Sequence, residues 1–289
     1  MNKEVLDVII SGLSNASVYA LLAMGMALTY GVAKIFNLAY GSLYSIAGYL
    51  AWMLFGLGLG YPMVFIIVLP ALFILGMLIE RFCVRPVRGK RDWDVLVVMI
   101  TLGLGMFLDS FDLNVFGPYL KQLPDLVGGN FSLAGVVISY TDLTVFIASL
   151  VAIAILIVFL NRTTLGMAIR ATAQDPEGAA IVGIRANNIF AIVFGISTLL
   201  AGVGAILLAS RYFVSYKIGW DILYKAWLIT AFGGMGSLTG AGIAALILAM
   251  VEAFSLWKFN ANVTQILWFA ILVGVFIFRP QGLMGKRGS

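Results

Sequence analysis

The chain reads LTVFIASLVAIAILIVFL at residues 143–160, NRTTLGMAIRATAQDPEGAAIVGIRA at 161–186 and NNIFAIVFGISTLLAGVGAILLAS at 187–210. The first and third segments carry no charge, and each is close to the roughly 20 residues that an α-helix needs to cross a bilayer. A few turn residues would be enough to join two such helices. The polar connector between them, which continues to residue 188, therefore predicts an ordered surface on which a soluble partner can dock.

The composition is that of a membrane protein. Hydrophobic residues make up 62% of the chain and charged residues 11%, and the mean hydropathy is +1.05, whereas about 25% of the residues of a soluble domain are charged. A transmembrane β-barrel would show segments of about ten residues that alternate apolar and polar, and the sequence has no such alternation. Segments that are apolar on every face must satisfy their backbone groups within a helix. The uncharged runs lie at 8–33, 35–79, 95–108, 143–160, 187–210, 226–251 and 259–278. We therefore predict an all-α, polytopic membrane protein with about eight spanning helices, in a single transmembrane domain over residues 1–289.

A glycine-rich run, AFGGMGSLTGAG at 231–242, interrupts the apolar segment at 226–251. Glycine lets a helix end and turn at low steric cost, so we predict two short helices that meet at Gly233–Ser237 as a broken-helix or re-entrant hairpin. Irregular backbone at membrane depth is tolerated where it is buried in protein or lines a wet cavity, and broken helices commonly form substrate paths. Close packing of small residues is the alternative interpretation, because glycine and alanine recur in this run at four-residue spacing.

The basic residues predict the topology, because lysine and arginine tend to stay on the cytoplasmic side of a membrane. They favour cytoplasmic loops at about 81–93 and 161–188, and external loops at about 113–142, 210–225 and 257–264. The N-terminus is then outside and the C-terminus is cytoplasmic. The basic residues on the predicted cytoplasmic face are Lys34, Arg81, Arg85, Arg88, Lys90, Arg91, Arg162, Arg170, Arg185, Arg279, Lys286 and Arg287.

The sequence offers little for catalysis or nucleotide binding. It contains no histidine and one cysteine, Cys83, so the commonest metal ligand and general base is missing and no cysteine pair can form. The phosphate-binding pattern G-x-x-x-x-G-K-[ST] is also missing, because Arg287 follows Gly285 and Lys286. We therefore expect no enzyme activity, metal or cofactor in this chain, and we expect the energy for its work to come from a partner.

The connector is expected to form two short helices, over 163–173 and 176–184. Asp175 suits the N-cap of the second helix, and Pro176 suits its first helical position. A helix that lies across the membrane face in this way could sit in a cleft of a peripheral ATPase and be moved by it.

Carboxylates lie in or near the predicted spans at Asp109, Asp112 and Glu252. Each is either solvated at the level of the lipid headgroups or a functional group within the membrane. An ion-coupled secondary transporter or channel would need ionisable residues deep in its spans, and a membrane enzyme would have to use the Asp109/Asp112 pair. The scarcity of such residues favours transport powered by a partner, and both alternatives stay open.

Four groups of residues carry a resemblance to a known family. Tyr30-Gly31 precedes Asn37-Leu38-Ala39-Tyr40-Gly41-Ser42; Glu80-Arg81 precedes Arg85-Pro86-Val87-Arg88; Arg170-Ala171 precedes Asp175 and Gly183-Ile184; and Gly233-Gly234-Met235-Gly236-Ser237 with Gly240 precedes Arg279-Pro280-Gln281-Gly282-Leu283. In this order and spacing, over nearly the whole chain, they resemble the inner-membrane permeases of branched-chain amino acid ABC transporters, of the type often called LivH. Tyr40 and Ser42 depart from the pattern, since many of these permeases have histidine and an acidic residue there.

The resemblance implies a permease subunit in the bacterial or archaeal inner membrane that imports amino acids, branched-chain or hydrophobic, or a related small amide such as urea. It implies a second, similar permease subunit in a heterodimer, two cytoplasmic ATPase subunits that use ATP and magnesium, and an external solute-binding protein, with no role for nucleic acid. The implied residues for coupling to the ATPase are Arg170, Ala171, Asp175, Pro176, Glu177, Gly183 and Ile184. The implied residues of the translocation pathway are Asn37, Tyr40, Gly41, Ser42, Gly233, Gly234, Gly236 and Ser237.

Overall fold

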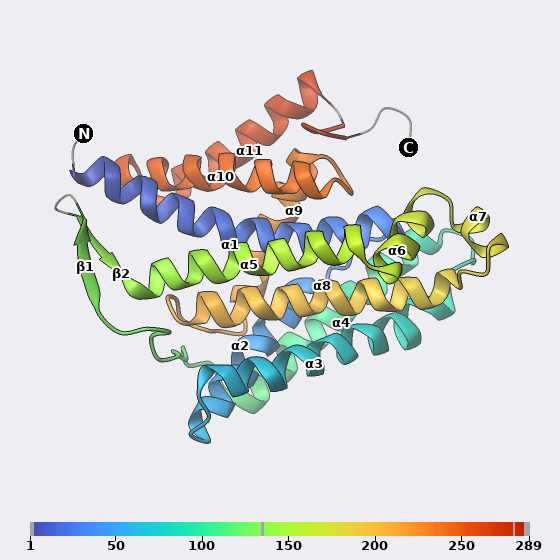
Figure 1. The fold of residues 1–289 in the computed structure, drawn as a ribbon, viewed down its shortest axis with the longest axis horizontal. Helices are drawn as coiled ribbons and strands as arrows, with labels where there is room; N and C mark the ends of the chain where they lie inside the picture. Colours follow the sequence, from blue (N-terminus) through green and yellow to red (C-terminus); the bar gives the residue numbers. More distant parts are fainter. Residues whose placement is uncertain (1–2, 134–135, 280, 286–289) are drawn as a thin grey trace.

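The computed structural model describes residues 3–133, 136–279 and 281–285, and it is almost entirely helical (Figure 1). The long helices are α1 (Lys3–Ala33), α3 (Tyr61–Ile79), α4 (Trp93–Phe116), α5 (Tyr140–Arg162), α8 (Ala186–Ala209), α10 (Leu238–Lys258) and α11 (Ala261–Phe278). The shorter elements are α2 (Tyr40–Gly56), α6 (Thr164–Gln174), α7 (Pro176–Ile181), α9 (Ile218–Gly233), the π-helical turn η1 (Glu80–Val84), the 3-10 turn η2 (Arg85–Val87) and the strands β1 (Asn130–Leu133) and β2 (Val136–Ser139). Pro280, Lys286 and Arg287, which the sequence analysis uses, lie outside the described residues.

Within the described residues, seven helices are long and apolar enough to cross a membrane. This confirms the predicted all-α, polytopic class. Helices α2 and α9 have 17 and 16 residues, which gives lengths of about 24–26 Å at about 1.5 Å per residue, less than the roughly 30 Å of a hydrocarbon core. Gly41 of α2 and Gly219 of α9 touch so closely that a Cβ atom on either residue would overlap the other's carbonyl oxygen. The two short helices therefore lie inside the bundle and pack on protein over much of their length.

The two ends of the bundle differ (Figure 1). The antiparallel β1–β2 hairpin lies at the end where α1 begins, and α6, α7 and the last described residues lie at the opposite end. We call these the β1–β2 end and the α6–α7 end. The hairpin falls in the segment predicted to be an external loop, 113–142. Backbone hydrogen bonds of 2.9 and 2.7 Å between Lys121 and Val214 join that segment to the connection between α8 and α9.

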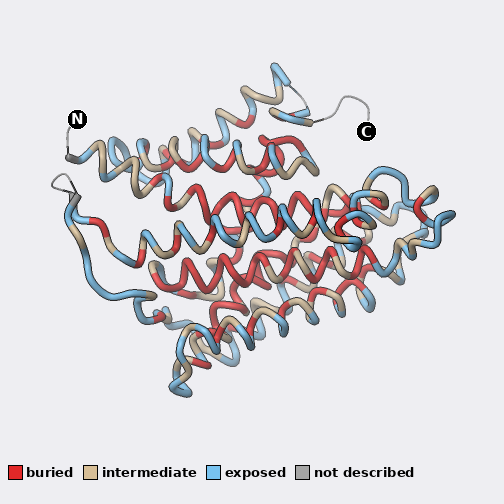
Figure 2. Tube along the Cα trace, in the orientation of Figure 1, coloured by how far each residue is buried: buried red, intermediate tan, exposed pale blue. Residues whose placement is uncertain are grey.

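The core follows α8 and the central turns of α1 (Figure 2). In the most apolar stretch of α8, 83% of the residues are buried. Small residues let the neighbouring helices approach: an added methyl group on Gly202 would overlap Leu72 of α3, and one on Gly204 would overlap Leu22 of α1. Helix α8 is therefore the central packing element of the bundle.

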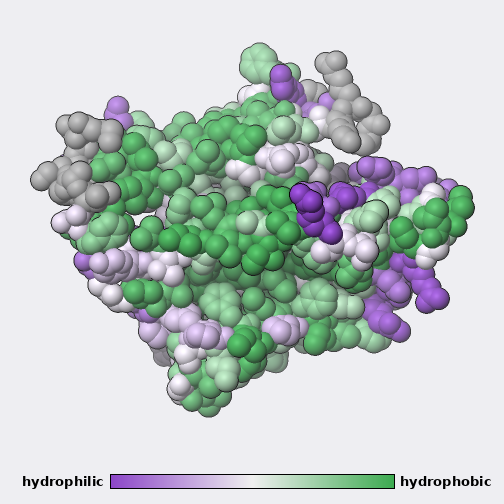
Figure 3. All heavy atoms as spheres, in the orientation of Figure 1, coloured by the Kyte–Doolittle hydropathy of each residue, from purple (hydrophilic) through white to green (hydrophobic). Residues whose placement is uncertain are grey.

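The outer surface is largely apolar along the bundle and hydrophilic at the α6–α7 end (Figure 3). Large side chains such as Ile66, Phe107 and Ile155 are exposed. A soluble monomer rarely exposes more than a few hundred Å² of contiguous apolar surface, whereas lipid solvates such a surface. The burial pattern is that of a multi-pass membrane protein.

The predicted turn is present, because α9 ends at Gly233 and α10 begins after Ser237. Of the two helices expected to be short, only α9 is, with 16 residues; α10 has 21 and is long enough to cross a membrane. Gly234 and Gly236 have φ angles of 103° and 84°, which L-residues with a side chain rarely adopt. The Ser237 hydroxyl accepts a hydrogen bond from the Gly240 amide at 3.0 Å and so caps α10. The turn lies at the α6–α7 end rather than midway through the bundle.

The loops at the β1–β2 end are shorter than the sequence predicts. Helix α9 begins at Ile218, inside the expected 210–225 loop, and only Phe259 and Asn260 separate α10 from α11 in the expected 257–264 loop. Lys225 therefore belongs to a helix. It can do so because it finds partners inside the bundle, as described below.

Candidate functional site

The connector forms two short, capped helices. The Thr163 hydroxyl donates to the Phe159 carbonyl at 2.7 Å and accepts from the Gly166 amide at 3.0 Å, so it joins the end of α5 to the start of α6. Asp175 Oδ1 accepts from the Glu177 amide at 3.0 Å, which confirms the predicted N-cap of α7. A cap of this kind stabilises a helix by about 0.5–2 kcal/mol. The connector is therefore an ordered structure.

One side of the connector packs on the bundle and the other side is open. Ile169 and Ala179 are buried, whereas Ile181 and Val182 are 87% and 74% exposed at the tip of α7. Gly183 follows with a φ of 87° and turns the chain toward α8. Two adjacent aliphatic side chains this exposed, on a hydrophilic end of the molecule, favour contact with another protein. Of the predicted coupling residues, Arg170, Asp175, Pro176, Glu177 and Gly183 are exposed, and Ala171 and Ile184 are half-buried.

A cavity of ≈ 700 Å³ separates α6 from the α9–α10 turn. Lys34 and Arg170 give it positive charge, and Gly31, Gly236 and Ser237 form part of its wall. Gly31 and Gly236 are in contact, since a Cβ atom on Gly31 would lie 3.1 Å from the Cα of Gly236. The structure thus brings Arg170 of the predicted coupling set next to Gly236 and Ser237 of the predicted pathway set. A second cavity, of ≈ 290 Å³, extends from the same walls between α1, α5 and α6.

The other two glycines of the turn pack on protein. A Cβ atom on Gly233 would lie 2.5 Å from the backbone of Gly240, and one on Gly234 would overlap the backbone amide of Gly285. Residues 281–285 also donate two backbone hydrogen bonds, of 2.8 and 3.0 Å, to the last carbonyls of α9. Close packing, the alternative interpretation of the glycine-rich run, therefore describes Gly233 and Gly234. Gly236 both packs on Gly31 and, with Ser237, lines the cavity.

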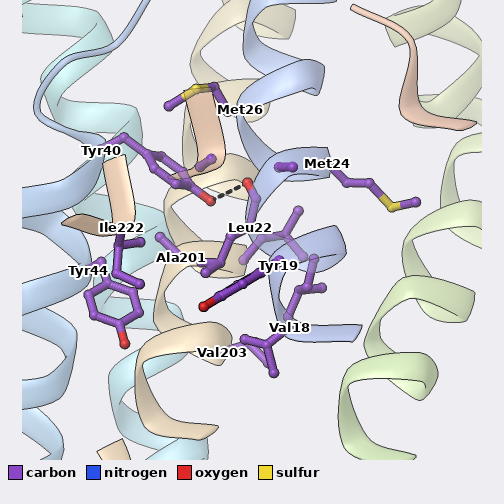
Figure 4. Packing of buried hydrophobic residues seen from close by; sticks show 14 of the residues in the cluster. Val18, Tyr19, Leu22, Met24, Met26, Tyr40, Tyr44, Ala201, Val203 and Ile222 are labelled. Carbon is purple, nitrogen blue, oxygen red and sulfur yellow. Dashed lines mark hydrogen bonds between the residues drawn. The ribbon is translucent and has the colours of Figure 1, made fainter. Parts of the chain in front are cut away.

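Tyr40 and Ser42, from the other predicted pathway set, lie deeper in the bundle at the start of α2. The Tyr40 hydroxyl reaches from α2 to α1 and donates to the Leu22 carbonyl at 2.9 Å (Figure 4). The Ser42 hydroxyl donates to the Gly105 carbonyl of α4 at 3.1 Å. Both residues are buried.

Asn37 and Gly41 complete this set. Asn37 is buried, and its Oδ1 accepts from the Ala39 amide at 3.1 Å, while Gly41 packs on α9 as described above. These residues therefore make the contacts through which α2 packs against α1, α4 and α9. Tyr40 contacts α1 at Leu22, about 13 Å along that helix from Gly31, where the hairpin turn touches α1.

A buried ion cluster fixes η1 and η2 to the start of α8. Glu80 is fully buried, and its carboxylate lies 3.1 Å from Arg85 Nη2 and 3.5 Å from Arg88 Nη1. Arg85 also donates to the Asn187 carbonyl at 2.9 Å, and the Arg88 guanidinium lies 3.8 Å from the centre of the Phe190 ring. Burial lowers the pKa of Arg88, while Glu80 opposes this shift. In the sequence, Arg85 and Arg88 indicate the topology and belong, with Glu80, to the residues that carry the family resemblance; the acidic residue before two arginines was the signal for an ion cluster.

A second charge pair, partly buried, joins α9 to α10 beside α1: the side chains of Lys225 and Glu252 are 27% and 12% exposed. Lys225 Nζ donates to Glu252 Oε1 at 2.7 Å and to the Tyr19 hydroxyl at 2.7 Å, and it lies 5.8 Å from the centre of the Trp268 ring. A cavity of ≈ 230 Å³ adjoins the pair. Sequence reasoning placed Lys225 in an external loop and left Glu252 open. Their positions in the sequence could have indicated the pair, because the two opposite charges stand at the two ends of the uncharged run at 226–251.

The Asp109/Asp112 pair lies on α4 toward the β1–β2 end. The Trp220 indole N–H of α9 donates to Asp109 Oδ2 at 2.7 Å. Asp112 is fully buried, so solvation at headgroup level does not describe it.

Comparisons with known proteins found a matching family and several related permeases. The family described as "Branched-chain amino acid transport system / permease component" matches residues 8–276. The high-affinity branched-chain amino acid transport system permease protein BraD of Pseudomonas aeruginosa is 33% identical, over 97% of this chain and 96% of its own. The corresponding protein LivH of Escherichia coli (strain K12) is 29% identical, over 96% and 94%. The autoinducer 2 import system permease protein LsrC of Photorhabdus luminescens is 26% identical, over 86% and 72%. No solved structure matches the chain.

Proposed function

Because this chain belongs to the family of branched-chain amino acid transport system permease components, we propose that it imports branched-chain or other hydrophobic amino acids and receives the work of ATP hydrolysis through its connector. Membership makes the chain a multi-pass membrane permease subunit of an ABC importer, which works with ATPase and solute-binding partners. Among its relatives, BraD and LivH are named for branched-chain amino acids and LsrC for autoinducer 2. The solute is therefore the part of the proposal that most needs a direct test.

The proposed assembly places two ATPase subunits at the α6–α7 end and the solute-binding protein at the β1–β2 end. A second, similar permease subunit completes the membrane core as a heterodimer. The N-terminus of the chain is then outside and the C-terminus cytoplasmic. The charge distribution supports this orientation, since Lys34, Arg88 and Arg170 all belong to structure at the α6–α7 end and basic residues favour the cytoplasmic side.

The exposed tip of α7 is the observation that carries the docking proposal. Ile181 and Val182 present their aliphatic side chains to the outside, and the capped helices hold them in one orientation. Burying one such side chain in a partner contributes about 1.5–3 kcal/mol. Arg170 of α6 and Asp175 and Glu177 at the start of α7 are exposed charges of the same connector, and they can set the register of docking.

Movement of the docked connector has a direct route into the bundle. Thr163 joins α6 to the end of α5 through two hydrogen bonds, so force on α6 acts on α5. The ≈ 700 Å³ cavity gives α6 room to move toward the α9–α10 turn. Such a movement would bring Arg170 toward Gly236 and Ser237, at the point where that turn touches α1. In the proposed cycle these two residues line the inner mouth of the pathway, and the buried joint at Asn37–Ser42 sets the angle between α1 and α2.

The test is uptake into vesicles that contain the complete complex with its binding protein. We expect ATP-dependent accumulation of labelled leucine, isoleucine or valine, and co-purification of the ATPase subunits with this chain. Uptake of urea or short amides without uptake of any amino acid would reject the proposed solute class. Retention of the ATPase after the connector is altered at its tip would reject the proposed docking surface.

A further inference from the structure

The cavity beside Lys225 and Glu252 lies within the membrane region, between α9, α10 and α11. Lys225 contacts Tyr19, which is near the middle of α1. At about 1.5 Å per residue, Lys225 and Trp268 are about 10 Å along their helices from the ends that face the β1–β2 end. Asp221, in the first turn of α9, lines the outer part of the cavity. A solute released at the β1–β2 end would meet this cavity before it reached the connector.

The polar groups that line the cavity are not saturated by one another. An ammonium group has three N–H donors, and Lys225 uses two of them, on Glu252 Oε1 and the Tyr19 hydroxyl. Among the described residues, Glu252 Oε2, Trp268 Nε1 and the Tyr224 hydroxyl are buried without a hydrogen-bond partner. Proteins seldom leave buried polar atoms unpaired unless a ligand or water completes them. One anionic acceptor and several donors, one of them cationic, are thus available at the same cavity.

A purely structural ion pair would not need this arrangement. Moving charges out of water is costly, and a buried pair is stable only when further hydrogen bonds satisfy its remaining atoms. Within the part of the chain that the structure describes, the second carboxylate oxygen of Glu252 and the indole N–H of Trp268 have no hydrogen-bond partner. The pair also borders a cavity instead of being enclosed by packed side chains.

The free groups match one solute chemistry. An α-amino acid carries an ammonium group, which donates, and a carboxylate, which accepts, on neighbouring carbon atoms. Glu252 Oε2 can accept from the ammonium group, while Lys225 Nζ and Trp268 Nε1 can donate to the carboxylate. A zwitterion presents a complementary charge to each member of this pair, whereas a neutral amide presents neither charge and a simple ion presents only one. The volume of ≈ 230 Å³ is below the roughly 300–1,000 Å³ of pockets for drug-sized ligands, as expected for a small solute.

We infer that the cavity formed by Tyr224, Lys225, Glu252 and Trp268 binds the zwitterionic main-chain atoms of an α-amino acid during its passage through the membrane. The inference rests on the proposed function and deepens it, because it names the groups that recognise what all α-amino acids share. The neighbouring Leu256 and Ala261 also line the cavity and offer apolar surface to an aliphatic side chain.

The decisive variant replaces both charges at once, as Lys225→Met with Glu252→Leu. Replacing a buried ion pair by apolar residues of similar volume is often neutral or stabilising for folding, so the complete complex should assemble with its ATPase subunits. ATP-driven uptake of labelled leucine should nevertheless fall at least tenfold, because a hydrogen bond to a charged group is lost at each end of the solute. Trp268→Phe, which removes only the indole N–H, should lower uptake by about tenfold. Trp257→Phe is the matched control, since Trp257 is exposed at the end of α10 and does not line the cavity.

A photoreactive diazirine analogue of leucine gives an independent readout. During turnover of the wild-type complex it should label peptides from α9, α10 or α11, and excess leucine should prevent the labelling. Leucine uptake by the double variant at the wild-type rate would overturn the inference while leaving amino acid import intact. A wild-type complex that transports no amino acid would instead overturn the proposed function, and the inference with it. If the double variant fails to assemble, unchanged uptake by Trp268→Phe, or labelling confined to other helices, would still overturn the inference.

Discussion

Replacing Val182 by asparagine tests whether the tip of α7 is the surface that holds the ATPase. Val182 is 74% exposed, so the change should alter the stability of the permease itself by less than about 0.5 kcal/mol. In the docked complex, a buried valine contributes about 1.5–3 kcal/mol. Loss of that contribution corresponds to an ATPase affinity that is about 10- to 100-fold weaker.

The matched control is Val137→Asn. Val137 is 66% exposed on β2, at the opposite end of the bundle, so the same chemical change is made away from the proposed interface. ATPase retention on the purified permease core, measured over a range of salt and detergent-wash conditions, should fall for Val182→Asn only. ATP-driven uptake should fall in parallel. Equal retention by the two variants would refute the assignment of the α7 tip, and equal loss by both would mean that surface polarity acts without a specific interface.

Three further experiments test the packing, the buried charge and the orientation. Gly41→Leu should destabilise the complex by about 1–3 kcal/mol, because the new side chain would overlap Gly219. Gly103→Leu should leave the stability unchanged, since the space at its Cβ position is open. Equal unfolding temperatures for the two variants would contradict the contact between α2 and α9. Glu80→Leu should lower the stability by about 3–5 kcal/mol, since it leaves Arg85 and Arg88 without their buried counter-charge. Arg91→Met, at a side chain that is 96% exposed, should change the stability little. Both are measured by thermal unfolding in detergent, and an unchanged unfolding temperature for Glu80→Leu would show that the cluster does not stabilise the fold. In a Cys83→Ser background, a cysteine at Glu177 should react with a membrane-impermeant thiol reagent only from the cytoplasmic side, and one at Asn130 only from outside; the reverse pattern would invert the proposed topology.

The class of the fold was predictable because it depends on composition and on local pattern. Long uncharged runs require helices in lipid, and Gly233, Gly234 and Gly236 mark the turn between α9 and α10. Asp175 and Pro176 were recognisable as the start of α7 because a cap involves only neighbours in the chain. The length of α9 was not predictable in the same way. Lys225 looks like a loop residue until Glu252 and Tyr19 are known to lie beside it.

The candidate site was predictable in part, for the same reason. The connector is recognisable in the sequence as a polar segment between apolar runs. The cavity that Lys34 and Gly236 line exists only because α6, α1 and the hairpin turn meet in the folded protein. The resemblance implies that Gly233 and Gly234 belong to the translocation pathway, whereas in the structure they pack on Gly240 and Gly285. The packing of residues 281–285 on the end of α9 joins segments that local pattern cannot relate.

Hydropathy, charge bias and glycine placement are properties of neighbouring residues, and they were sufficient for a helical membrane protein with an ordered polar connector and a hairpin near its C-terminal side. Which charges are neutralised, which glycines are enclosed and which cavity contains unpaired polar groups depend on contacts between helices that are distant in the chain. In lipid, every buried polar atom needs a partner, so those long-range contacts determine whether Lys225 and Glu252 lie at the surface or form the centre of a binding site.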